Sequence, residues 1–448
     1  MGYERACTTD TAAAGAMSGE EAVAYLKSRA SLGSKLGLSR IRELLAALGN
    51  PQKTLRFVHV AGTNGKGSTS AMLASILAAA GYRVGLFTSP CLERINEQIT
   101  VNGEPISDEA LGAGMGALKQ AAEAMADPPS EFEVLTALAF LHFVQCGCDL
   151  VVLEVGMGGA TDSTNVIDPP EAAVITAISL DHTAVLGHSL TEIAAVKAGI
   201  IKSGCDVVLY PNPSVERIIA EICDRQGARL HPVELARATA LKHGLEGQTF
   251  QWDGEELFLP LLGGHQLNNA AAALTTIEIL RTRGWSVSPE AVRLGLRRTR
   301  WPARFEVLIR EPLFLLDGGH NPQGAAALAD NIAEYLPGRT LTFLVGLLAD
   351  KDYEAMLRRV EPFASAFVAV SPNNSRALPV EALAEHLAGF GKPVTICGSV
   401  EQGVEAARML AEEGGAVCAF GSLYMAGAVR RCVLGEKALR EESSNGRI

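Results

Sequence analysis

The sequence is poor in aromatic residues, in net positive charge and in long hydrophobic runs. Aromatic residues make up 5% of its 448 positions, too few for the stacking platforms with which proteins hold single-stranded nucleic acids. Lysine and arginine number 39 against 50 aspartate and glutamate residues, and the formal net charge of −11 argues against general binding to phosphate backbones or anionic membranes. No apolar stretch reaches the ~18 residues that a membrane-spanning helix needs. We therefore expect no nucleic-acid partner and no membrane partner.

Cysteine is also sparse, and its pattern does not suggest disulfide bonds. Nine cysteines, an odd number, are scattered along the chain, which is typical of reduced thiols in a cytoplasmic protein. Cys146 and Cys148 form a CxC pair, but no second pair or histidine lies at a zinc-like spacing, so we interpret both as ordinary thiols. The N-terminal stretch MGYERACTTDTAAAGAMSGEEA lacks the basic start and apolar core of a signal peptide. The expected location is therefore the cytoplasm.

The chain is rich in short apolar runs that alternate with helical patterns. Hydrophobic residues make up 48% and charged residues 20%, an ordinary globular composition. The runs at 56–61, 83–89, 149–156 and 172–180 are continuously apolar, and helices are expected between them, for example over 69–82 and 191–204. This pattern predicts a parallel sheet covered by helices on both faces. The short pieces at 249–261 suggest antiparallel hairpins, and a second strand–helix series follows Trp301.

The length of the chain predicts more than one domain. Single hydrophobic cores stop growing at about 250–300 residues, so we expect two α/β domains, residues 1–299 and residues 300–448. The first is expected to hold a mostly parallel sheet, and the second is smaller. A cleft between two such domains is the expected place for a ligand.

The strongest local signal is the loop VAGTNGKGST, residues 60–69, between an expected strand and an expected helix. Glycine lets backbone N–H groups turn inward around an anion, and the N-terminus of the following helix adds partial positive charge. Lys66 can then reach the outer phosphates of a nucleotide. The match to the usual P-loop is imperfect, because Val60 takes the place of the first glycine and Gly67 that of the metal-binding hydroxyl residue. A tight glycine turn without a nucleotide is the alternative.

Polar side chains follow the next three expected strands where each strand ends. Ser89 follows the second strand, Glu154 ends the third, and Asp181 and His182 follow the fourth. Open α/β sheets bind ligands at this edge. A hydroxyl, a carboxylate and an imidazole near a nucleotide suit Mg²⁺, with phosphate oxygens and water as the remaining ligands. The alternatives are a strand-end salt bridge for Glu154 and a structural role for His182.

Two further candidates are ambiguous from their local sequence. Lys197 lies in the helix expected over 191–204, where a solvated lysine is the default interpretation. The segment DGGHNPQ, residues 317–323, ends the second strand of the C-terminal series. It places one acid and one imidazole in a Gly-Gly and Asn-Pro turn, which is typical of a plain turn.

Taken in order, these motifs resemble those of the folylpolyglutamate synthase/dihydrofolate synthase family of the Mur ligase superfamily. The resemblance runs from about Gly37 to about Val429, nearly the whole chain. The forms GTNGKGS and DGGHNP are much more specific together than a lone glycine loop. The other matching motifs are GLSRIRELLAALGNP, FTSP-LERINEQI, LEVGMGG-TDSTNV, SLDHTAVLG, EIAAVKAGIIK, HQLNNAAAAL, WPAR, VGLLADKD and GSLYMAG.

The resemblance implies an N-terminal P-loop ATPase domain of the Mur ligase type, a C-terminal Rossmann-like domain and an active site between them. It also implies roles for individual residues. The residues expected to cradle the phosphates are Thr63, Asn64, Gly65, Lys66, Gly67 and Ser68. Further contacts with ATP are expected from Asn269, Arg304 and Asp317, the last two from the second domain. The expected ligands of two Mg²⁺ ions are Ser89, Glu154, His182 and a carbamylated Lys197, and His320 is expected close to the nucleotide and the acceptor. The implied catalytic set is Lys66, His182, Lys197 and His320.

The implied activity is the ATP-dependent joining of L-glutamate to a folate-type carboxylate, either a reduced folate or dihydropteroate, by a monomeric enzyme. A carboxylate does not react with an amine at neutral pH, because its leaving group would be oxide. Transfer of the γ-phosphoryl group from ATP makes an acyl phosphate, and the amine of glutamate then displaces phosphate. Because two anions must meet, cations such as Lys66, Mg²⁺ and Arg304 would stabilise the first step.

Two departures from the family pattern bear on the choice of acceptor. Cys91 replaces the histidine that usually follows TSP, and Ala160 replaces an arginine that lies near the pterin side of the acceptor in the family. The sequence therefore leaves open whether the chain makes dihydrofolate, extends polyglutamate tails or does both. The alternatives are a Mur-type amino-acid ligase acting on another carboxylate, and a nucleotide-dependent binding or switch protein.

Overall fold

The computed structural model describes residues 17–30, 33, 37–411 and 415–445, which divide into two compact units. The first unit runs to Leu235 and includes Asn269–Gly295; the second comprises Ala236–Asn268 and the chain from Leu296 onward. The division thus falls inside helix α9 (Gly264–Thr282) and inside helix α10 (Pro289–Arg298). The domain boundary at residue 300 remains a prediction. No helix within the described ranges is both long and apolar enough to cross a membrane.

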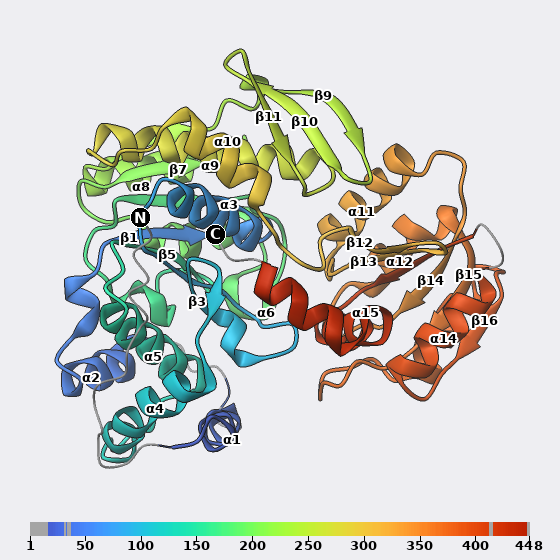
Figure 1. Ribbon diagram of the computed structural model, residues 1–448, viewed down its shortest axis with the longest axis horizontal. Helices are drawn as coiled ribbons and strands as arrows, with labels where there is room; N and C mark the ends of the chain where they lie inside the picture. Colours follow the sequence, from blue (N-terminus) through green and yellow to red (C-terminus); the bar gives the residue numbers. More distant parts are fainter. Residues whose placement is uncertain (1–16, 31–32, 34–36, 412–414, 446–448) are drawn as a thin grey trace. The chain divides into compact units, whose positions relative to one another are not determined.

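An eight-stranded sheet forms the frame of the first unit (Figure 1). Its strand order is β4-β3-β2-β5-β1-β6-β7-β8. The six strands β2, β5, β1, β6, β7 and β8 run parallel to one another, whereas β3 pairs antiparallel with both β2 and β4 at one edge. The strands are β1 (Phe57–Ala61), β2 (Val84–Phe87), β3 (Ile99–Val101), β4 (Glu104–Pro105), β5 (Leu150–Glu154), β6 (Ala172–Ile175), β7 (Asp206–Leu209) and β8 (Arg229–Pro232). The predicted mostly parallel sheet is confirmed, while β8 had no counterpart among the expected strands.

Helices bury this sheet, which is why its central strands are continuously apolar. Every residue of β1, β2, β5, β6 and β7 is buried. One core joins α1, α2, α4 and α5 to β1, β2 and β5, a second joins α7 and α8 to β6 and β7, and α3 packs against β1, β2 and β5 outside the first core. The helices are α1 (Gly19–Ala30), α2 (Ser39–Ala47), α3 (Lys66–Ala79), α4 (Asp108–Glu123), α5 (Glu131–Gln145), α6 (Thr183–Leu186), α7 (Leu190–Lys197) and α8 (Glu216–Gln226). Short 3₁₀ turns are η1 (Pro51–Thr54), η2 (Ile95–Gln98), η3 (Ser163–Val166), η4 (Ala198–Ile200) and η5 (Leu235–Arg237).

The strand register brings four carboxyl ends to one edge of the sheet. Ala61 of β1 pairs with Ile175 of β6, and Val60 pairs with Glu154, the last residue of β5. Phe87, which ends β2, pairs with Leu153 of β5. The loops that leave these strands therefore begin side by side, as the sequence predicted.

The helix predicted over 191–204 is shorter in the structure. α7 begins after Ser189, whose hydroxyl accepts a hydrogen bond from the Glu192 N–H while the Glu192 carboxylate accepts one from the Ser189 N–H. It ends at Lys197 and continues as the turn η4. A Cβ placed on Gly199 would lie 2.3 Å from Cβ of Ala160, so a distant segment packs against this turn. The predicted length was wrong because that tertiary contact leaves no signal in the local pattern.

The second unit contains a three-stranded antiparallel sheet in the order β11-β10-β9. Its strands are β9 (Ala238–Gly244), β10 (Gly247–Trp252) and β11 (Glu255–Leu259). Asp253 and Gly254 join β10 to β11 with φ of 50° and 87°, the positive values that a tight two-residue hairpin requires. The predicted hairpin is thereby confirmed.

A six-stranded sheet forms the larger part of the second unit, in the order β12-β13-β17-β14-β15-β16. Only the edge strand β12 pairs antiparallel. Helices α11, α12 and α13 share one apolar core with β13, β14, β15 and β17, while α14 and α15 pack against the strands outside that core. The strands are β12 (Glu306–Arg310), β13 (Leu313–Asp317), β14 (Leu341–Val345), β15 (Ala364–Ala369), β16 (Val394–Ile396) and β17 (Ala416–Phe420). The helices are α11 (Pro322–Tyr335), α12 (Tyr353–Val360) with the turn η6 (Glu361–Phe363), α13 (Val380–Ala388), α14 (Val400–Leu410) and α15 (Leu423–Asn445).

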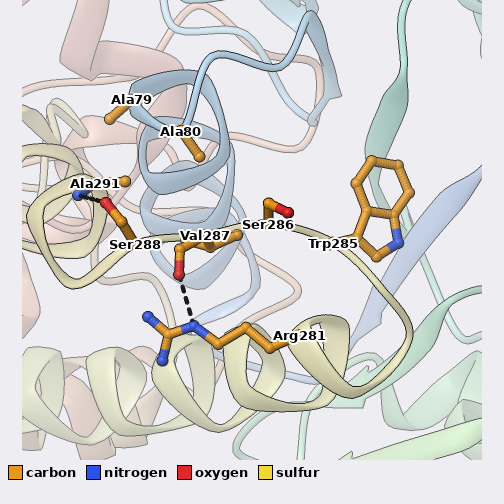
Figure 2. A pocket seen from close by; sticks show the side chains of 8 residues that line it. All are labelled: Ala79, Ala80, Arg281, Trp285, Ser286, Val287, Ser288 and Ala291. Carbon is orange, nitrogen blue, oxygen red and sulfur yellow. Dashed lines mark hydrogen bonds between the residues drawn. The ribbon is translucent and has the colours of Figure 1, made fainter.

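A cavity of 480 Å³ lies in the first unit where α3 and α9 end and α10 begins (Figure 2). Arg281 is the one charged residue in its lining, and Arg281 Nε donates to the carbonyl of Val287 at 2.8 Å. The Ser288 hydroxyl caps α10 by accepting from the Ala291 N–H. Because α3 has 14 residues, the cavity lies about 20 Å from the glycine loop at the opposite end of that helix.

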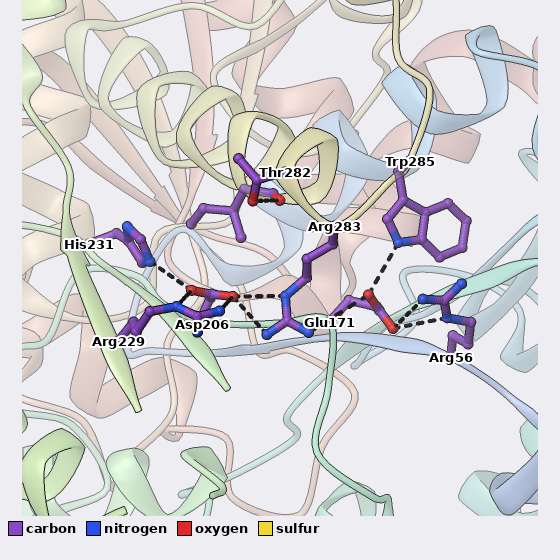
Figure 3. A network of polar contacts seen from close by, with 9 residues as sticks. Arg56, Glu171, Asp206, Arg229, His231, Thr282, Arg283 and Trp285 are labelled. Carbon is purple, nitrogen blue, oxygen red and sulfur yellow. Dashed lines mark hydrogen bonds and ion pairs between the residues drawn. The ribbon is translucent and has the colours of Figure 1, made fainter. Parts of the chain in front are cut away.

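An ionic network holds together the amino ends of the parallel strands (Figure 3). Asp206, the first residue of β7, is buried and accepts hydrogen bonds from Arg229 at 2.7 Å, His231 at 2.8 Å and Arg283 at 2.7 Å. Burial alone would raise the pKa of Asp206, but these three donors outweigh it and hold the pKa below its usual range. The carboxylate therefore stays ionised inside the sheet edge.

Glu171, just before β6, extends the network to the next strands. It pairs with Arg56 at 2.9 Å and accepts a hydrogen bond from Trp285 Nε1 at 3.2 Å, while Arg283 lies 4.0 Å from its second oxygen. Arg283 thus lies between the two carboxylates and fastens the end of α9 to β6 and β7. This arrangement stabilises the edge of the sheet opposite the loops that follow the carboxyl ends of the strands.

We predict that Asp206→Asn lowers the free energy of unfolding by about 2–3 kcal/mol, because it leaves two guanidinium groups without their shared carboxylate. The matched control is Asp224→Asn, on the exposed face of α8, which should change stability little. Urea unfolding of both variants measures the difference. Because the folded pKa of Asp206 is lowered, its stabilisation is complete above the ordinary aspartate pKa of about 3.9 and disappears as pH falls through the lower folded value. An equal loss in both variants would contradict the proposed role of the network.

Candidate active site

The glycine loop leaves β1 at Ala61 and enters α3 at Lys66, and two neighbours pack closely against it. A Cβ on Gly62 would lie 1.9 Å from Oγ1 of Thr176, and a Cβ on Gly65 would lie 2.4 Å from Oδ1 of Asn269. Gly65 also has φ of 86°, a left-handed conformation that glycine adopts without strain. Both glycines are therefore required by close approach. Asn269 of α9 lies against the loop, and its contact with a nucleotide stays a prediction.

The backbone N–H groups of the loop point in two directions. Those of Thr63 and Asn64 both donate to the carbonyl of Ala177, at 2.8 and 3.2 Å. The N–H groups from Gly65 to Ser68 open the helix, and the first intrahelical bond is made by the Thr69 N–H to the carbonyl of Gly65. The predicted phosphate cradle of residues 63–68 thus has two parts. The N–H groups of residues 63 and 64 bind the segment after β6, whereas those of residues 65–68 form a helix N-terminus that is suited to an anion.

Lys66 and Glu154 meet at this helix N-terminus. Nζ of Lys66 lies 3.3 Å from the carbonyl oxygen of Thr63, to which it donates, and 3.9 Å from Oε1 of Glu154. The Glu154 side chain is buried, and its Oε2 accepts a hydrogen bond from the Ser89 N–H at 3.3 Å. The structure therefore brings together three of the predicted residues, Lys66, Ser89 and Glu154, from three different loops.

These residues fit a magnesium ion better than a softer metal. The Ser89 hydroxyl and the Glu154 carboxylate are hard oxygen donors of the kind Mg²⁺ prefers, and Mg²⁺ keeps phosphate and water oxygens as its remaining ligands. Among the described residues, no group of three or more histidine, cysteine, aspartate and glutamate side chains gathers into a cage that would hold a metal without such help. The donor set thus agrees with an ion that arrives with a nucleotide.

His182 lies at the start of α6, on the segment that follows β6. Its φ of 49° and ψ of 38° place it in the left-handed region, and its N–H donates to the Asp181 carboxylate at 2.8 Å. The side chain is exposed. The segment itself is tied to the glycine loop, because the Thr63 hydroxyl donates to the carbonyl of Ser179 at 3.0 Å and accepts from the Ser179 N–H at 3.1 Å.

Lys197 is buried rather than solvated. Its side chain reaches from the end of α7 to the glycine loop, where Nζ donates to the carbonyl of Gly62 at 2.7 Å. Burial and, to a smaller extent, the charge of Lys66 lower the pKa of Lys197 to about 7, while Asp181 and Asp162 act in the opposite direction. The neutral amine of Lys197 is therefore accessible near pH 7, in contrast to a free lysine with a pKa of about 10.4.

A buried polar chain that the sequence analysis missed lies beside these lysines. His59 of β1 contacts the Thr164 hydroxyl through Nε2 at 2.9 Å, and that hydroxyl donates to Asp162 at 2.6 Å. Asp162 also accepts from the N–H groups of Met157 and Thr164. Burial raises the pKa of Asp162 and lowers that of His59 to about 3, so the histidine is neutral. The only sequence signal was the spacing of polar residues within TDSTN and the histidine inside an apolar strand.

Three predicted residues belong to the second unit, where they form a compact turn. Asp317 ends β13, and its two oxygens accept from the N–H groups of Phe305 at 2.8 Å and Gly319 at 2.7 Å. Burial raises the pKa of Asp317, while the nearby Arg304 guanidinium lowers it. The Nδ1 of His320 lies 3.0 Å from the carbonyl oxygen of Gly318. The segment 317–323 is thus an ordered turn in which Asp317 lies close to Arg304, with His320 three residues after Asp317.

Cys91 and Ala160, the two departures from the family pattern, both lie in the first unit and carry no charge. Burial raises the pKa of Cys91 to about 11, with a further contribution from Glu97, so its thiol stays protonated. The Ala160 side chain is exposed, and its N–H donates to the carbonyl of Val196 at 3.0 Å, next to Lys197. Neither residue supplies the charge of the side chain that it replaces.

Comparison with known proteins agrees with this geometry. Residues 60–277 match the model of the Mur ligase middle domain, and residues 303–423 match that of the Mur ligase glutamate ligase domain. The chain is 37% identical over 437 residues to folylpolyglutamate synthase of Lacticaseibacillus casei, covering 93% of this chain and 99% of that protein. It is 39% identical over 360 residues to dihydrofolate synthase/folylpolyglutamate synthase of Bacillus subtilis, covering 78% and 84%.

A solved structure of the Escherichia coli protein FolC in complex with DHPP and ADP has a similar fold. Its TM-score is 0.82 at 31% sequence identity, and the match covers 96% of this chain and all of that one. The α/β architecture with two mostly parallel sheets, inferred from the sequence, is confirmed by this likeness.

We predict that Gly65→Ala weakens binding of a non-hydrolysable ATP analogue at least tenfold, because the new Cβ would collide with Asn269 and reshape the loop. Gly81→Ala is the matched control: its φ of 92° imposes a similar backbone strain of about 1–2 kcal/mol, but nothing lies within 4 Å of the new Cβ. Calorimetric titration should show normal affinity for Gly81→Ala, and thermal unfolding should show that both variants fold but lose stability, with the larger loss in Gly65→Ala. Equal affinity of both variants would contradict the assignment of the loop.

Proposed function

Because the chain belongs to the folylpolyglutamate synthase/dihydrofolate synthase family of Mur ligases, we propose that it is an ATP-dependent ligase that joins L-glutamate to a folate-type carboxylate. The observation that carries this proposal is the meeting of Lys66, Ser89, Glu154 and Lys197 at the glycine loop. A solvated turn does not bury a lysine and a glutamate beside a helix N-terminus.

The reaction consists of two displacements. A carboxylate oxygen of the acceptor attacks the γ-phosphorus of ATP, the bond to the bridging oxygen breaks, and ADP leaves. The glutamate nitrogen then attacks the carbonyl carbon of the acyl phosphate, phosphate leaves with the bonding electron pair, and the nitrogen gives up a proton. The products are an amide, ADP and phosphate.

The first unit supplies the cations and N–H groups that the first displacement needs. The free N–H groups of Gly65–Ser68 would hold the phosphates, and Lys66 would leave the Thr63 carbonyl for the outer phosphate. Ser89 and Glu154 would hold a Mg²⁺ ion, with His182 and Lys197 toward a second one. When bound, such an ion offsets the negative charge that the transferred group carries.

Residues of α9 and of the second unit complete the assignment. We assign ATP contacts to Asn269, which packs against Gly65, and to Arg304 and Asp317. Asp317 is held by two backbone N–H groups and Arg304 lies close to it, so both groups are oriented before a nucleotide arrives. His320 is assigned a place near the nucleotide and the acceptor.

The acceptor is either dihydropteroate or a reduced folate. The names of the relatives include both activities, and the solved Escherichia coli neighbour contained DHPP and ADP. Ala160 replaces the arginine that the family places near the pterin side of the acceptor, and Cys91 replaces the histidine after TSP, so the experiment below decides between the two acceptors.

The direct test incubates the protein with ATP, Mg²⁺ and labelled glutamate, with dihydropteroate in one reaction and a reduced folate in another. We expect label in at least one folate product and release of ADP that depends on both glutamate and acceptor. Release of ADP without either substrate would favour a switch protein. Incorporation into neither folate would point to a Mur-type ligase for another carboxylate and would refute the folate assignment.

We also propose that Lys197 is carbamylated in the active enzyme. Carbon dioxide adds only to a neutral amine, and the pKa of about 7 supplies that form at physiological pH. The carbamate nitrogen keeps one hydrogen, so the hydrogen bond to Gly62 is compatible with the modification. The new anion would face the metal ions and replace the repulsion between Lys197 and Lys66 by attraction.

We predict that ¹³C-bicarbonate gives a carbamate NMR signal in the wild-type protein that grows between pH 6 and pH 8, because the neutral fraction of Lys197 rises through its pKa. Lys197→Ala should lose this signal and most of the activity, and a small carboxylic acid should restore part of the activity. Lys53→Ala, in the turn η1, is the control and should keep both. Full activity of Lys197→Ala would remove the lysine from the mechanism.

We further propose that the enzyme acts as a cytoplasmic monomer. Its substrate ATP is supplied there, and every cysteine in the described part of the chain is a free thiol, as a reducing compartment maintains.

A further inference from the structure

Three consecutive carbonyl groups of the glycine loop are each held by a side chain. Nζ of Lys197 donates to the carbonyl of Gly62, Nζ of Lys66 to that of Thr63, and Oγ1 of Thr176 to that of Asn64. In a trans peptide the C=O and the following N–H point to opposite sides, so fixing a carbonyl also fixes the direction of the next N–H. The side chains beneath the loop therefore decide which N–H groups face an incoming anion.

The Thr176 hydroxyl controls the peptide at the point where the loop changes direction. Before that point, the N–H groups of Thr63 and Asn64 turn inward to Ala177. The Asn64 carbonyl is held at 2.9 Å by Thr176, so the N–H of Gly65 must point away from the sheet. Gly65 is the first of the four residues whose N–H groups have no intrahelical acceptor.

The buried position of Thr176 holds its hydroxyl in the hydrogen bond with the Asn64 carbonyl. It follows the last residue of β6, is buried, and its N–H already donates to the Ala61 carbonyl at 2.8 Å. The hydroxyl lies 3.2 Å from the same Ala61 oxygen and 2.9 Å from the Asn64 oxygen, and its single proton serves the shorter bond. Oγ1 also fills the space where a Cβ on Gly62 would lie.

We infer that Thr176 is a positioning residue of the nucleotide site, whose hydroxyl orients the Asn64–Gly65 peptide so that the Gly65 N–H faces the phosphates. This inference rests on the proposed function. Thr176 touches neither substrate nor reacting atoms; it acts through the loop. It differs from Lys66 and Lys197 because it carries no charge and has no other assignment in the reaction.

The test compares wild-type protein with Thr176→Val, which keeps the branched shape without the hydroxyl, and Thr176→Ser, which keeps the hydroxyl. We expect Thr176→Val to weaken binding of a non-hydrolysable ATP analogue about tenfold and to raise the KM for ATP similarly, with the KM for glutamate unchanged. Thr176→Ser should stay within about twofold of wild type. Thr176→Ala, which adds no bulk, should repeat the result of Thr176→Val and serves if the valine variant does not fold.

The unfolding midpoint without nucleotide separates positioning from mere stability. A hydroxyl-free variant that unfolds earlier yet binds the analogue like wild type would overturn the inference, as would a serine variant as weak as the valine one. If the wild-type protein has normal ligase activity and Thr176→Val binds the analogue as well as wild type, the inference about Thr176 is wrong but the proposed function stands. Failure of the wild-type protein to bind the analogue would overturn the proposed function and this inference together.

Discussion

The conformation of the glycine loop in the first unit depends on hydrogen bonds from two lysines. Lys66 and Lys197 both donate to loop carbonyls, and their mutual repulsion helps to keep the pKa of Lys197 near neutrality. Without the Gly62 carbonyl, the buried amino group of Lys197 would lose the acceptor of its hydrogen bond, at a large cost in free energy. The fold of the loop and the charge of the site thus depend on each other.

The polar residues at the amino ends of the parallel strands stabilise the sheet, and those at the carboxyl ends form the candidate active site. At the amino edge, Asp206 and Glu171 are saturated by arginines and lie inside a network that holds strands and the end of α9 together. At the carboxyl edge, Lys66 Nζ lies 3.9 Å from Oε1 of Glu154, too far for a hydrogen bond, so this ion pair is looser than those of the amino edge. A tighter pairing of Glu154 with Lys66 at the carboxyl ends of the strands would make both side chains less available to a ligand.

The sequence predicted the frame of the molecule because strand, loop and helix signals agreed. Continuous apolar runs predicted the parallel sheet, and the glycine motif around Lys66 predicted the turn from β1 into the start of α3. The end of α7 escaped prediction, since the contact between Gly199 and Ala160 joins segments far apart in the chain. Thr176 and His59 also escaped, because a threonine after a strand and a histidine within one carry no signal until the neighbouring backbone is known. Burial of Lys197 likewise depends on the whole fold rather than on its helix.

The hollow at the far end of α3 bears on how inhibitors of this protein should be sought. This cavity of 480 Å³ lies a whole helix away from the glycine loop, and Arg281 is the one charged residue in its lining. A compound that fills it would therefore make no contact with the glycine loop. A compound that competes with ATP would instead have to accept hydrogen bonds from the row of backbone amides at the start of α3, about 20 Å away.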